Sequence, residues 1–403
     1  MNIGEEEQDI VIVGGGICGL ATALALHRKG IRSMVLERSE SLRAAGVGII
    51  MQPNGWRALD QLGVAPKLRQ TCTEIPSGTF IKVEDGKFGE SELPLGKGEL
   101  RCLKRMELMS TLAEALPAES VHLGCRVVSI VTDPVTSDPV LQLHNGTLIK
   151  AKIVIGCDGM NSIISKFVGV NPPKLFSRCA ARGFTYYEHG HPFGDKFRVH
   201  DACGVALGQL PVTDKLAYWF LTRSLTSQDL SDSKKDPTYI KQVSVEALKG
   251  FPEKVVEMVK NTDPKALYLT ELRYRAPWDI ARAKFRKGTV VVAGDALHAM
   301  CPFISQGGGA SLEDAVVLAR CLSEKLKQAD NESGDGRKKL TEEAMDLYVK
   351  ERRMRVFWLS LQTYLIGLTL DNMSKMKRVL GIAGLILMFG NQKSHTDYDC
   401  GRL

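Results

Sequence analysis

Three glycines near the start of the chain have the spacing of a turn that binds a dinucleotide: Gly14, Gly16 and Gly19. In this GxGxxG pattern the first glycine permits a tight turn, the second lets the backbone approach a phosphate, and the third lets a helix pack against a strand. The pattern lies between an apolar run at 10–13, which predicts a strand, and a helical pattern at 17–30. A second strand, expected over 33–37, ends on Glu37, whose carboxylate is placed to accept hydrogen bonds from ribose hydroxyls. The spacing therefore predicts a nucleotide whose pyrophosphate meets a helix N-terminus.

Further motifs, far along the chain, favour FAD over NAD as the nucleotide. Asp158 follows an apolar strand in the run GCDGMNS, and Asp295 follows another and is placed to bind the hydroxyls of a ribityl chain. The next loop ends in Gly307–Gly309 at the start of a helix. The dipole of that helix would stabilise negative charge on the N1–C2 edge of a reduced flavin. A nicotinamide dehydrogenase usually needs only the first motif, so the set of motifs predicts FAD.

On three of these motifs, GGGICG, CDGMNS and GDALHAMCPFISQGGG, the chain resembles the group A, single-component FAD-dependent aromatic hydroxylases, and within them the plant monooxygenase branch. The resemblance covers nearly the whole chain, from Asp9 to the tail at 399–401. It implies that the cofactor contacts Gly14, Gly15, Gly16, Gly19, Glu37, Arg38, Arg43, Gly48, Arg105, Asp158, Asp295, Gly307, Gly308 and Gly309. Among these, Arg105 matches a family arginine at a helix start, and Arg43 and Gly48 match the loop beside the flavin.

The resemblance also implies the reaction. NAD(P)H reduces FAD, reduced FAD forms a C4a-hydroperoxide with O2, and one oxygen atom hydroxylates or epoxidises a small aromatic or terpenoid-like metabolite. The flavin carries this chemistry, so we expect no catalytic side chain and no metal. Two alternatives stay open: a flavin oxidase or reductase of the same fold without oxygen insertion, and a redox-sensing flavoprotein.

One position departs from the family pattern. The motif CDGMNS usually continues to an arginine at the position of Ser165, and here a lysine follows instead at Lys166. If the family arginine helps to bind the nicotinamide cosubstrate, Lys166 would replace it as a point charge, without the planar fork of a guanidinium. The choice between NADPH and NADH stays open. No second GxGxxG follows a strand, so we expect no separate NAD(P)H domain.

These motifs predict a doubly wound, Rossmann-like α/β domain that binds FAD. Between the second and third motifs, the sequence alternates between apolar and polar residues and is rich in aromatic residues. This pattern predicts a mostly antiparallel β-sheet domain for the substrate. Helical patterns interrupt these runs near 236–249 and 253–261, and further helices end the chain. The expected boundaries are 1–174 with 288–330 for FAD, 175–287 for the substrate and 331–403 for the C-terminal helices.

Composition excludes several classes of protein. The 403 residues are 44% apolar and 25% charged, with a net charge of +7, and no Lys/Arg run has the interleaved aromatic residues of a nucleic-acid site. The ten cysteines lack CxxC spacing, which argues against a flavin disulfide reductase and for a reducing, cytoplasmic compartment. The acidic first residues predict no leader sequence. We expect a small-molecule substrate, no nucleic acid, and a monomer or dimer.

An apolar stretch near the end of the chain has three interpretations. Val379–Phe389 has eleven residues, too few to span a bilayer as a helix. The stretch packs against the body of the protein, or it contacts a membrane surface or covers the substrate entrance. Lys375, Lys377 and Arg378 precede it and would favour peripheral contact with anionic lipid.

Overall fold

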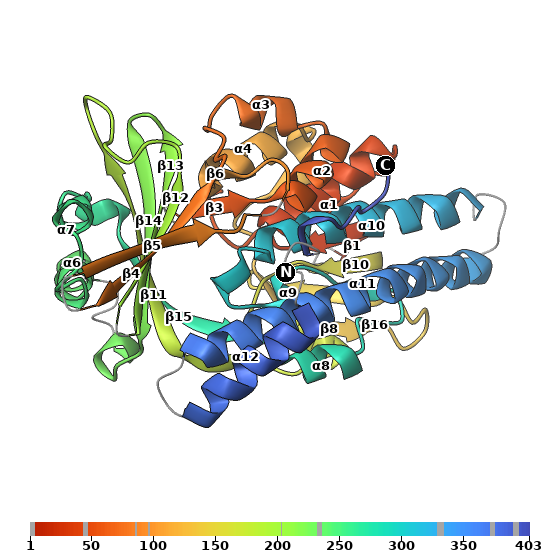
Figure 1. Cartoon of the computed structure of the whole chain (residues 1–403). Coiled ribbons are helices and arrows are strands. Elements are labelled where there is room, and N and C mark those ends of the chain that lie inside the picture. Colours follow the sequence, from red (N-terminus) through yellow and green to blue (C-terminus); the bar gives the residue numbers. More distant parts are fainter. Residues whose placement is uncertain are drawn as a thin grey trace.

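The computed structural model describes residues 5–42, 47–84, 87–95, 97–202, 204–231, 236–328, 334–370, 375–389 and 395–403. Within them, two β-sheets lie side by side, and helices cover both (Figure 1). The sheets differ in strand direction and in which faces are buried, and these differences decide what each contributes to the site.

The first sheet is mostly parallel. Its eight described strands are β1 (Glu5–Val13), β2 (Met34–Leu36), β7 (Val121–His122), β8 (Val127–Thr132), β9 (Pro139–Leu143), β10 (Leu148–Gly156), β16 (Arg286–Lys287) and β17 (Val290–Val292). Strand β1 lies between β10 and β2 and is parallel to both. Ile10, Val11, Ile12 and Val13 are all buried, as expected for a central parallel strand that is covered on both faces.

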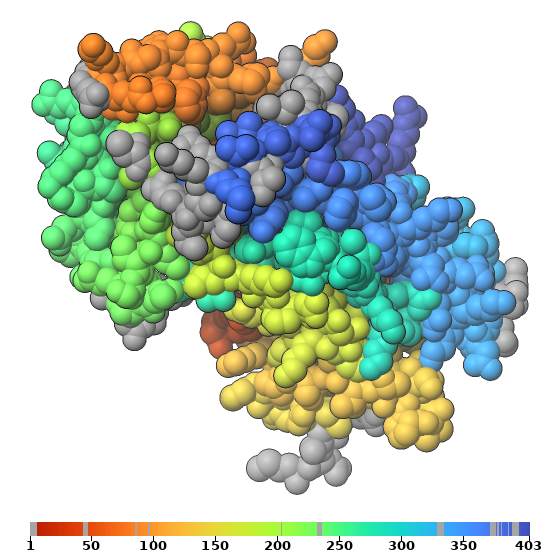
Figure 2. All heavy atoms as spheres, turned by 60° about the horizontal axis from the view of Figure 1, so that its bottom comes forward, coloured from red at the N-terminus to blue at the C-terminus, as the bar shows by residue number. Residues whose placement is uncertain are grey.

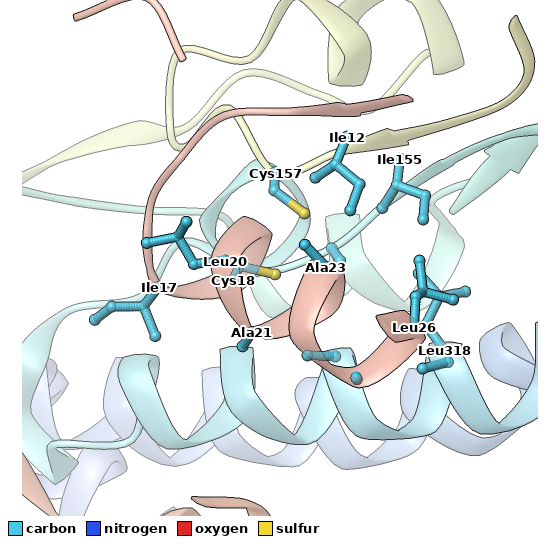
Figure 3. Packing of buried hydrophobic residues seen from close by; sticks show 14 of the residues in the cluster. Ile12, Ile17, Cys18, Leu20, Ala21, Ala23, Leu26, Ile155, Cys157 and Leu318 are labelled. Carbon is cyan, nitrogen blue, oxygen red and sulfur yellow. The ribbon is translucent and has the colours of Figure 1, made fainter. Parts of the chain in front are cut away.

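Helix α1 (Ile17–Arg28) follows β1 after the glycine turn and is buried from Ile17 to Leu26. Figure 3 shows Ile12 of β1 and Ile155 of β10 facing α1 from one side, and Leu318 of helix α10 (Gly307–Gln328) facing it from the other. The helix is therefore held between the sheet and α10. This packing fixes the start of α1 against the strand ends.

The second sheet is almost wholly antiparallel. In order across the described residues, its strands are β15 (Tyr268–Tyr274), β11 (Lys174–Tyr186), β14 (Leu216–Ser224), β13 (Val205–Thr213), β12 (Phe197–Ala202), β4 (Gly78–Glu84) and β5 (Lys87–Leu93). Only the β12–β4 pair is parallel. Helices α6 (Pro237–Ala247) and α7 (Glu253–Lys260) cover one face (Figure 1). The expected α/β fold with a mostly antiparallel second sheet is confirmed.

The sequence-based boundaries differ from the observed sheets in two respects. Strand β16 falls within the expected 175–287 segment, yet it pairs with β17 in the first sheet. Strands β4 and β5 come from residues 78–93, which the boundaries placed in the FAD-binding domain, yet they pair with β12 in the second sheet. A small two-stranded sheet of β3 (Gly48–Met51) and β6 (Arg101–Lys104) lies near them in the sequence. The chain therefore enters the second sheet twice.

The remaining helices are α2 (Pro53–Leu62), α3 (Ala65–Arg69), α4 (Arg105–Glu114), α5 (Ile163–Val168), α8 (Pro277–Arg282), α9 (Asp295–His298), α11 (Gly334–Leu370) and α12 (Lys375–Phe389). Helix α12 lies on the surface (Figure 2) and packs on α11, where Gly384 meets Leu365. Its other side exposes apolar side chains, with Val379 at 63% and Leu387 at 84%. The apolar stretch thus packs only in part, and among the described residues we find no helix long and apolar enough to cross a membrane.

Candidate FAD and substrate site

A single cavity of about 1480 Å³ extends from the strand ends of the first sheet to the open face of the second. Pockets for one small ligand usually measure about 300–1,000 Å³, so this cavity has room for a dinucleotide and a second small molecule. It is lined by the glycine turn, by the loop before α10 and by side chains of β11, β12 and β14. Both sheets therefore contribute to one site.

The cavity brings together most of the residues that the sequence singled out. Those that line it are Gly14, Gly15, Gly16, Glu37, Arg38, Gly48, Arg105, Asp158, Asp295, Gly307 and Gly308. Two others lie behind the wall, because a Cβ on Gly19 would be 1.9 Å from the Gly14 carbonyl oxygen and Gly309 packs against Asn54. Arg43 lies outside the described residues.

The glycine turn is closed on one side and open on the other. Gly14 has φ +105°, and a Cβ there would lie 2.5 Å from the carbonyl oxygen of Cys157. A Cβ on Gly16 would meet no atom within 4 Å. The backbone thus presses against the neighbouring strand end at Gly14 and faces free space at Gly16. That is the shape of a cradle for a phosphate at the start of α1.

Two carboxylates, at the ends of the strands on either side of β1, are held by backbone N–H groups. Glu37 accepts hydrogen bonds from the N–H of Gly15 at 2.7 Å and from the N–H of Ser39 at 2.9 Å. Asp158 accepts from the hydroxyl of Ser162 and from the N–H of Ile163, at the start of α5. Burial raises the pKa of Asp158, and these hydrogen bonds oppose the rise. Each carboxylate keeps lone pairs for a ligand hydroxyl.

Asp295 and the start of α10 rest on a buried network of charged groups. The Asp314 carboxylate accepts a hydrogen bond from the N–H of Gly294 at 2.8 Å, pairs with His298 at 2.6 Å and pairs with Arg352 at 2.7 Å. Gly294 has φ +61°, and Asp314 thereby fixes the residue before Asp295 in this left-handed conformation. His298 is fully buried against Asp314 and lies behind the cavity, which supports a structural role for this residue.

A second buried carboxylate completes the network. Glu313 pairs with Arg352 at 2.7 Å and with Arg355 at 2.8 Å, and it accepts a hydrogen bond from the amide of Asn54 at 2.6 Å. Burial alone would raise the pKa of both carboxyls. His298 and Arg352 instead lower the pKa of Asp314 to about 2, and Arg352 and Arg355 lower the pKa of Glu313. Two negative charges thus face two positive charges beneath the helix that starts at Gly307.

The structure does not bring Lys166 to the cavity. Its side chain is exposed and is not part of the lining, whereas Ser165 is buried and donates a hydrogen bond to the carbonyl of Ala296. The cation beside Ser165 is Arg275 of the β15–α8 segment, which donates to the same carbonyl oxygen at 3.0 Å. The hypothesis that Lys166 replaces the family arginine in the site therefore finds no support. Sequence reasoning missed Arg275 because it lies about 110 residues further along the chain.

The second sheet lines the cavity with rows of residues that face each other across strands. One row is Arg182, Phe220, Gly208, Val199 and Phe80, and the next is Ala180, Thr222, Ala206 and Asp201. Directly opposite residues of neighbouring strands share a face, so each row follows from the register. Among the aromatic residues of the second sheet, Phe197, Tyr218 and Phe220 lie in the cavity wall. Arg182 and Asp201 were not predicted at all.

The arrangement is that of a flavoprotein oxidoreductase, and comparisons with known proteins agree. The family model described as an FAD binding domain matches residues 7–338. Monooxygenase 1 of Arabidopsis thaliana is 49% identical over 400 residues, 99% of this chain and 100% of that protein, and Monooxygenase 2 of the same plant is 36% identical over 414 residues, 99% of each. Klebsiella pneumoniae HpxO, solved with FAD and uric acid, has the same fold, with a TM-score of 0.78 at 21% identity over 98% of this chain and 96% of that one. The chain belongs to the family of FAD-dependent monooxygenases.

Proposed function

We propose that this enzyme uses NAD(P)H and O2 to hydroxylate or epoxidise a small aromatic or terpenoid-like metabolite. The observation that carries the proposal is the continuity of the cavity from the glycine turn, past Asp295 and Gly307, to the aromatic face of the second sheet. A ligand long enough to reach from Gly16 to Gly307 would place its far end beside that face. When bound, FAD supplies the activation of O2 and the transfer of one oxygen atom.

The residues of the first domain would bind and orient the cofactor. The N-terminus of α1 and the open side of Gly16 suit the pyrophosphate, and the Glu37 carboxylate suits the ribose hydroxyls. Asp295 suits the ribityl hydroxyls. The start of α10 at Gly307 presents backbone N–H groups, whose partial positive charge would stabilise a negative flavin ring.

The second sheet would hold the substrate and keep water away from the reacting atoms. Tyr218, Phe220 and Phe197 form a mostly apolar wall with few polar groups of its own. The Tyr218 ring packs on β3, since a Cβ added to Gly48 would lie 2.5 Å from it. Through this contact the aromatic wall meets β3, whose Gly48 matches the family's loop beside the flavin. An enclosed apolar wall favours oxygen transfer over loss of the oxygen as peroxide.

The test is the visible spectrum of the purified protein, followed by the products of turnover. We expect a yellow protein that NADPH bleaches without oxygen and that regains its colour in air. With a substrate present, NADPH oxidation should yield oxygenated product, with little hydrogen peroxide. Stoichiometric peroxide and no oxygenated product with every aromatic and terpenoid substrate tried would contradict oxygen insertion and indicate an oxidase. Failure to take up added FAD would contradict the proposal at its base.

A further inference from the structure

A cation of the second sheet lies in the cavity wall. Arg182 of β11 lines the cavity and is half-buried, and no hydrogen bond or ion pair joins its guanidinium to any residue within the described ranges. Arginine stays protonated at any physiological pH. The wall therefore carries an uncompensated positive charge that faces the cavity.

The surroundings of Arg182 on the same face of the sheet are apolar. Phe220 lies directly opposite it on β14, and Tyr218 lies two residues further along that strand, on the same face. Burial raises the pKa of the Tyr218 hydroxyl, and the charge of Arg182 opposes this rise, which places the guanidinium close to the ring. Ala180 precedes Arg182 on the same face of β11. A flat aromatic molecule against these side chains would leave the guanidinium with little water.

The position of Arg182 along β11 sets it beside the proposed flavin ring. On one side, Ala180 packs with Cys301 and Phe303 in the loop that leads to α10. On the other side, Tyr218 packs against Gly48 of β3. Arg182 thus lies between contacts to the two segments that are proposed to flank the ring. The space in front of it is where the proposed function requires the substrate.

Among the described residues of the second sheet, no carboxylate lies beside Arg182 in the cavity lining. Asp201 is the only other charged residue that the described second sheet contributes to the lining. Three strand spacings separate β11 from β12, a distance of about 14 Å at the usual spacing. Asp201 also has an interaction of its own. A negatively charged ligand in this half of the cavity would supply the neutralising group.

We propose that Arg182 binds a carboxylate carried by the aromatic substrate, so that the enzyme selects aromatic acids over their neutral analogues. This inference rests on the proposed function, since it assigns the substrate to the second-sheet half of the same cavity. A guanidinium matches a carboxylate with two parallel hydrogen bonds, and such bonds are strong where water is excluded. A neutral ring in the same place would bury the Arg182 charge without a partner, which is costly.

The experiment compares two probes of nearly equal shape, benzoate and benzamide. The FAD-loaded protein is titrated with each at pH 7.5, and the dissociation constants are read from the change in the visible flavin spectrum. We expect the wild type to bind benzoate at least tenfold more tightly than benzamide, and R182Q to weaken benzoate at least tenfold while benzamide changes less than twofold. The affinity of R182K for benzoate should lie between those of the wild type and R182Q, because a lysine keeps the charge but lacks the two parallel N–H donors of a guanidinium.

The matched control is K215Q, which removes one exposed positive charge from the β13–β14 turn outside the cavity lining. It should keep the preference for benzoate. No preference for benzoate in the wild type, including no binding of either probe, would overturn the inference, as would a preference that persists in R182Q. Loss of FAD from R182Q alone would also overturn it, because it would assign Arg182 to the cofactor. If the wild type itself takes up no FAD, the proposed function fails instead.

Discussion

The two halves of the cavity are lined by different kinds of group: mostly backbone atoms in one half and mostly side chains in the other. The nucleotide half is made largely of backbone: Gly14 and Gly16 shape the turn, and Gly307 opens α10. The sheet half is made of side chains in alternating positions of strands, such as Arg182 and Phe220. Backbone groups bind phosphate and ring edges that every FAD molecule shares. Side chains can vary from one protein to the next while the strands stay in place, so this half suits the choice of substrate.

A buried network of charged groups lies beneath the start of α10 in the nucleotide half. Asp314 and Glu313 meet Arg352 and Arg355 at 2.7–2.8 Å, and three of these four side chains are fully buried. The sheet half has no described network of this kind in the cavity wall. Its shape depends instead on close packing between neighbours, such as the Phe220 ring over Gly208. Substitutions in the nucleotide half should therefore affect stability and FAD binding, and substitutions in the sheet half should affect substrate binding.

The largest effect should come from removing the centre of the charged network. Arg352→Met would leave the buried carboxylates of Asp314 and Glu313 without their shared partner, and we expect a loss of about 3–5 kcal/mol in the free energy of unfolding. Urea denaturation of the FAD-free protein, followed by circular dichroism, measures this loss.

The control for Arg352→Met is Lys249→Gln, which breaks an ion pair with Glu246 whose side chains are 75% and 65% exposed. Its expected cost lies within about 1 kcal/mol of zero. A loss below about 1 kcal/mol for Arg352→Met as well would mean that the network does not support the nucleotide half.

The next prediction concerns a substitution in the glycine turn that should weaken FAD binding without affecting folding. Gly16→Val adds atoms where a Cβ meets nothing within 4 Å, so the protein should fold normally, but the side chain would fill the space proposed for the pyrophosphate. Losing one or two phosphate hydrogen bonds should weaken FAD binding about 100-fold. Fluorescence quenching of FAD titrated with the apoprotein gives the dissociation constant.

Gly89→Val on β5 is the matched control for Gly16→Val, because a Cβ there also meets nothing within 4 Å and lies outside the cavity lining. It should bind FAD like the wild type. If Gly16→Val binds FAD as tightly as the wild type, the pyrophosphate binds elsewhere. The conclusion that backbone groups of the glycine turn bind the nucleotide would then be wrong.

The same division decides what could be predicted from the sequence. A backbone cradle requires glycine at fixed spacing, so Gly14, Gly16 and Gly307 were found without coordinates, and the parallel strands around them followed from short apolar runs. Arg182 gave no signal, because period-two alternation is the same for a core strand and for a cavity wall. Its role depends on which of the two sheet faces α6 and α7 leave uncovered. That choice is made by tertiary packing.

Pairing between strands that are far apart in the sequence could not be predicted either. Strand β4 joins the second sheet through parallel pairing with β12, about 120 residues later, and nothing local in residues 78–84 indicates that partner. Arg275 likewise shares the Ala296 carbonyl with Ser165 from a distant strand end. Contacts of this kind depend on the completed fold, and a single sequence contains them only implicitly.

The covered face of the second sheet should give a pH-dependent stability that the cavity face lacks. His200 of β12 is buried on that face, and neither ring nitrogen has a described partner. Burial, helped by the charge of Arg198, lowers its pKa to about 4, while the unfolded chain has the ordinary value of about 6.5. The unfolded state therefore takes up the proton first as the pH falls. Stability is fully present above pH 6.5 and should decrease by about 2 kcal/mol at pH 5.

The pH effect is isolated by His200→Leu, which removes the titrating group and keeps an apolar side chain on the covered face. Urea denaturation of both proteins between pH 7.5 and pH 5 should show a smaller decrease for the variant. Parallel curves for wild type and variant would assign the acid sensitivity to other groups.

The smallest expected effect tests whether the sheet half acts on substrate alone. Gly208→Ala places a Cβ 2.2 Å from the Cζ atom of Phe220, so the ring must shift within the cavity wall. Overpacking of this kind costs about 1–3 kcal/mol, and we expect benzoate to bind the FAD-loaded variant about tenfold more weakly. FAD affinity should match the wild type, in contrast to Gly16→Val. If Gly208→Ala also weakens FAD binding, the two halves are not independent, because a side chain of the sheet would then be holding the cofactor in place.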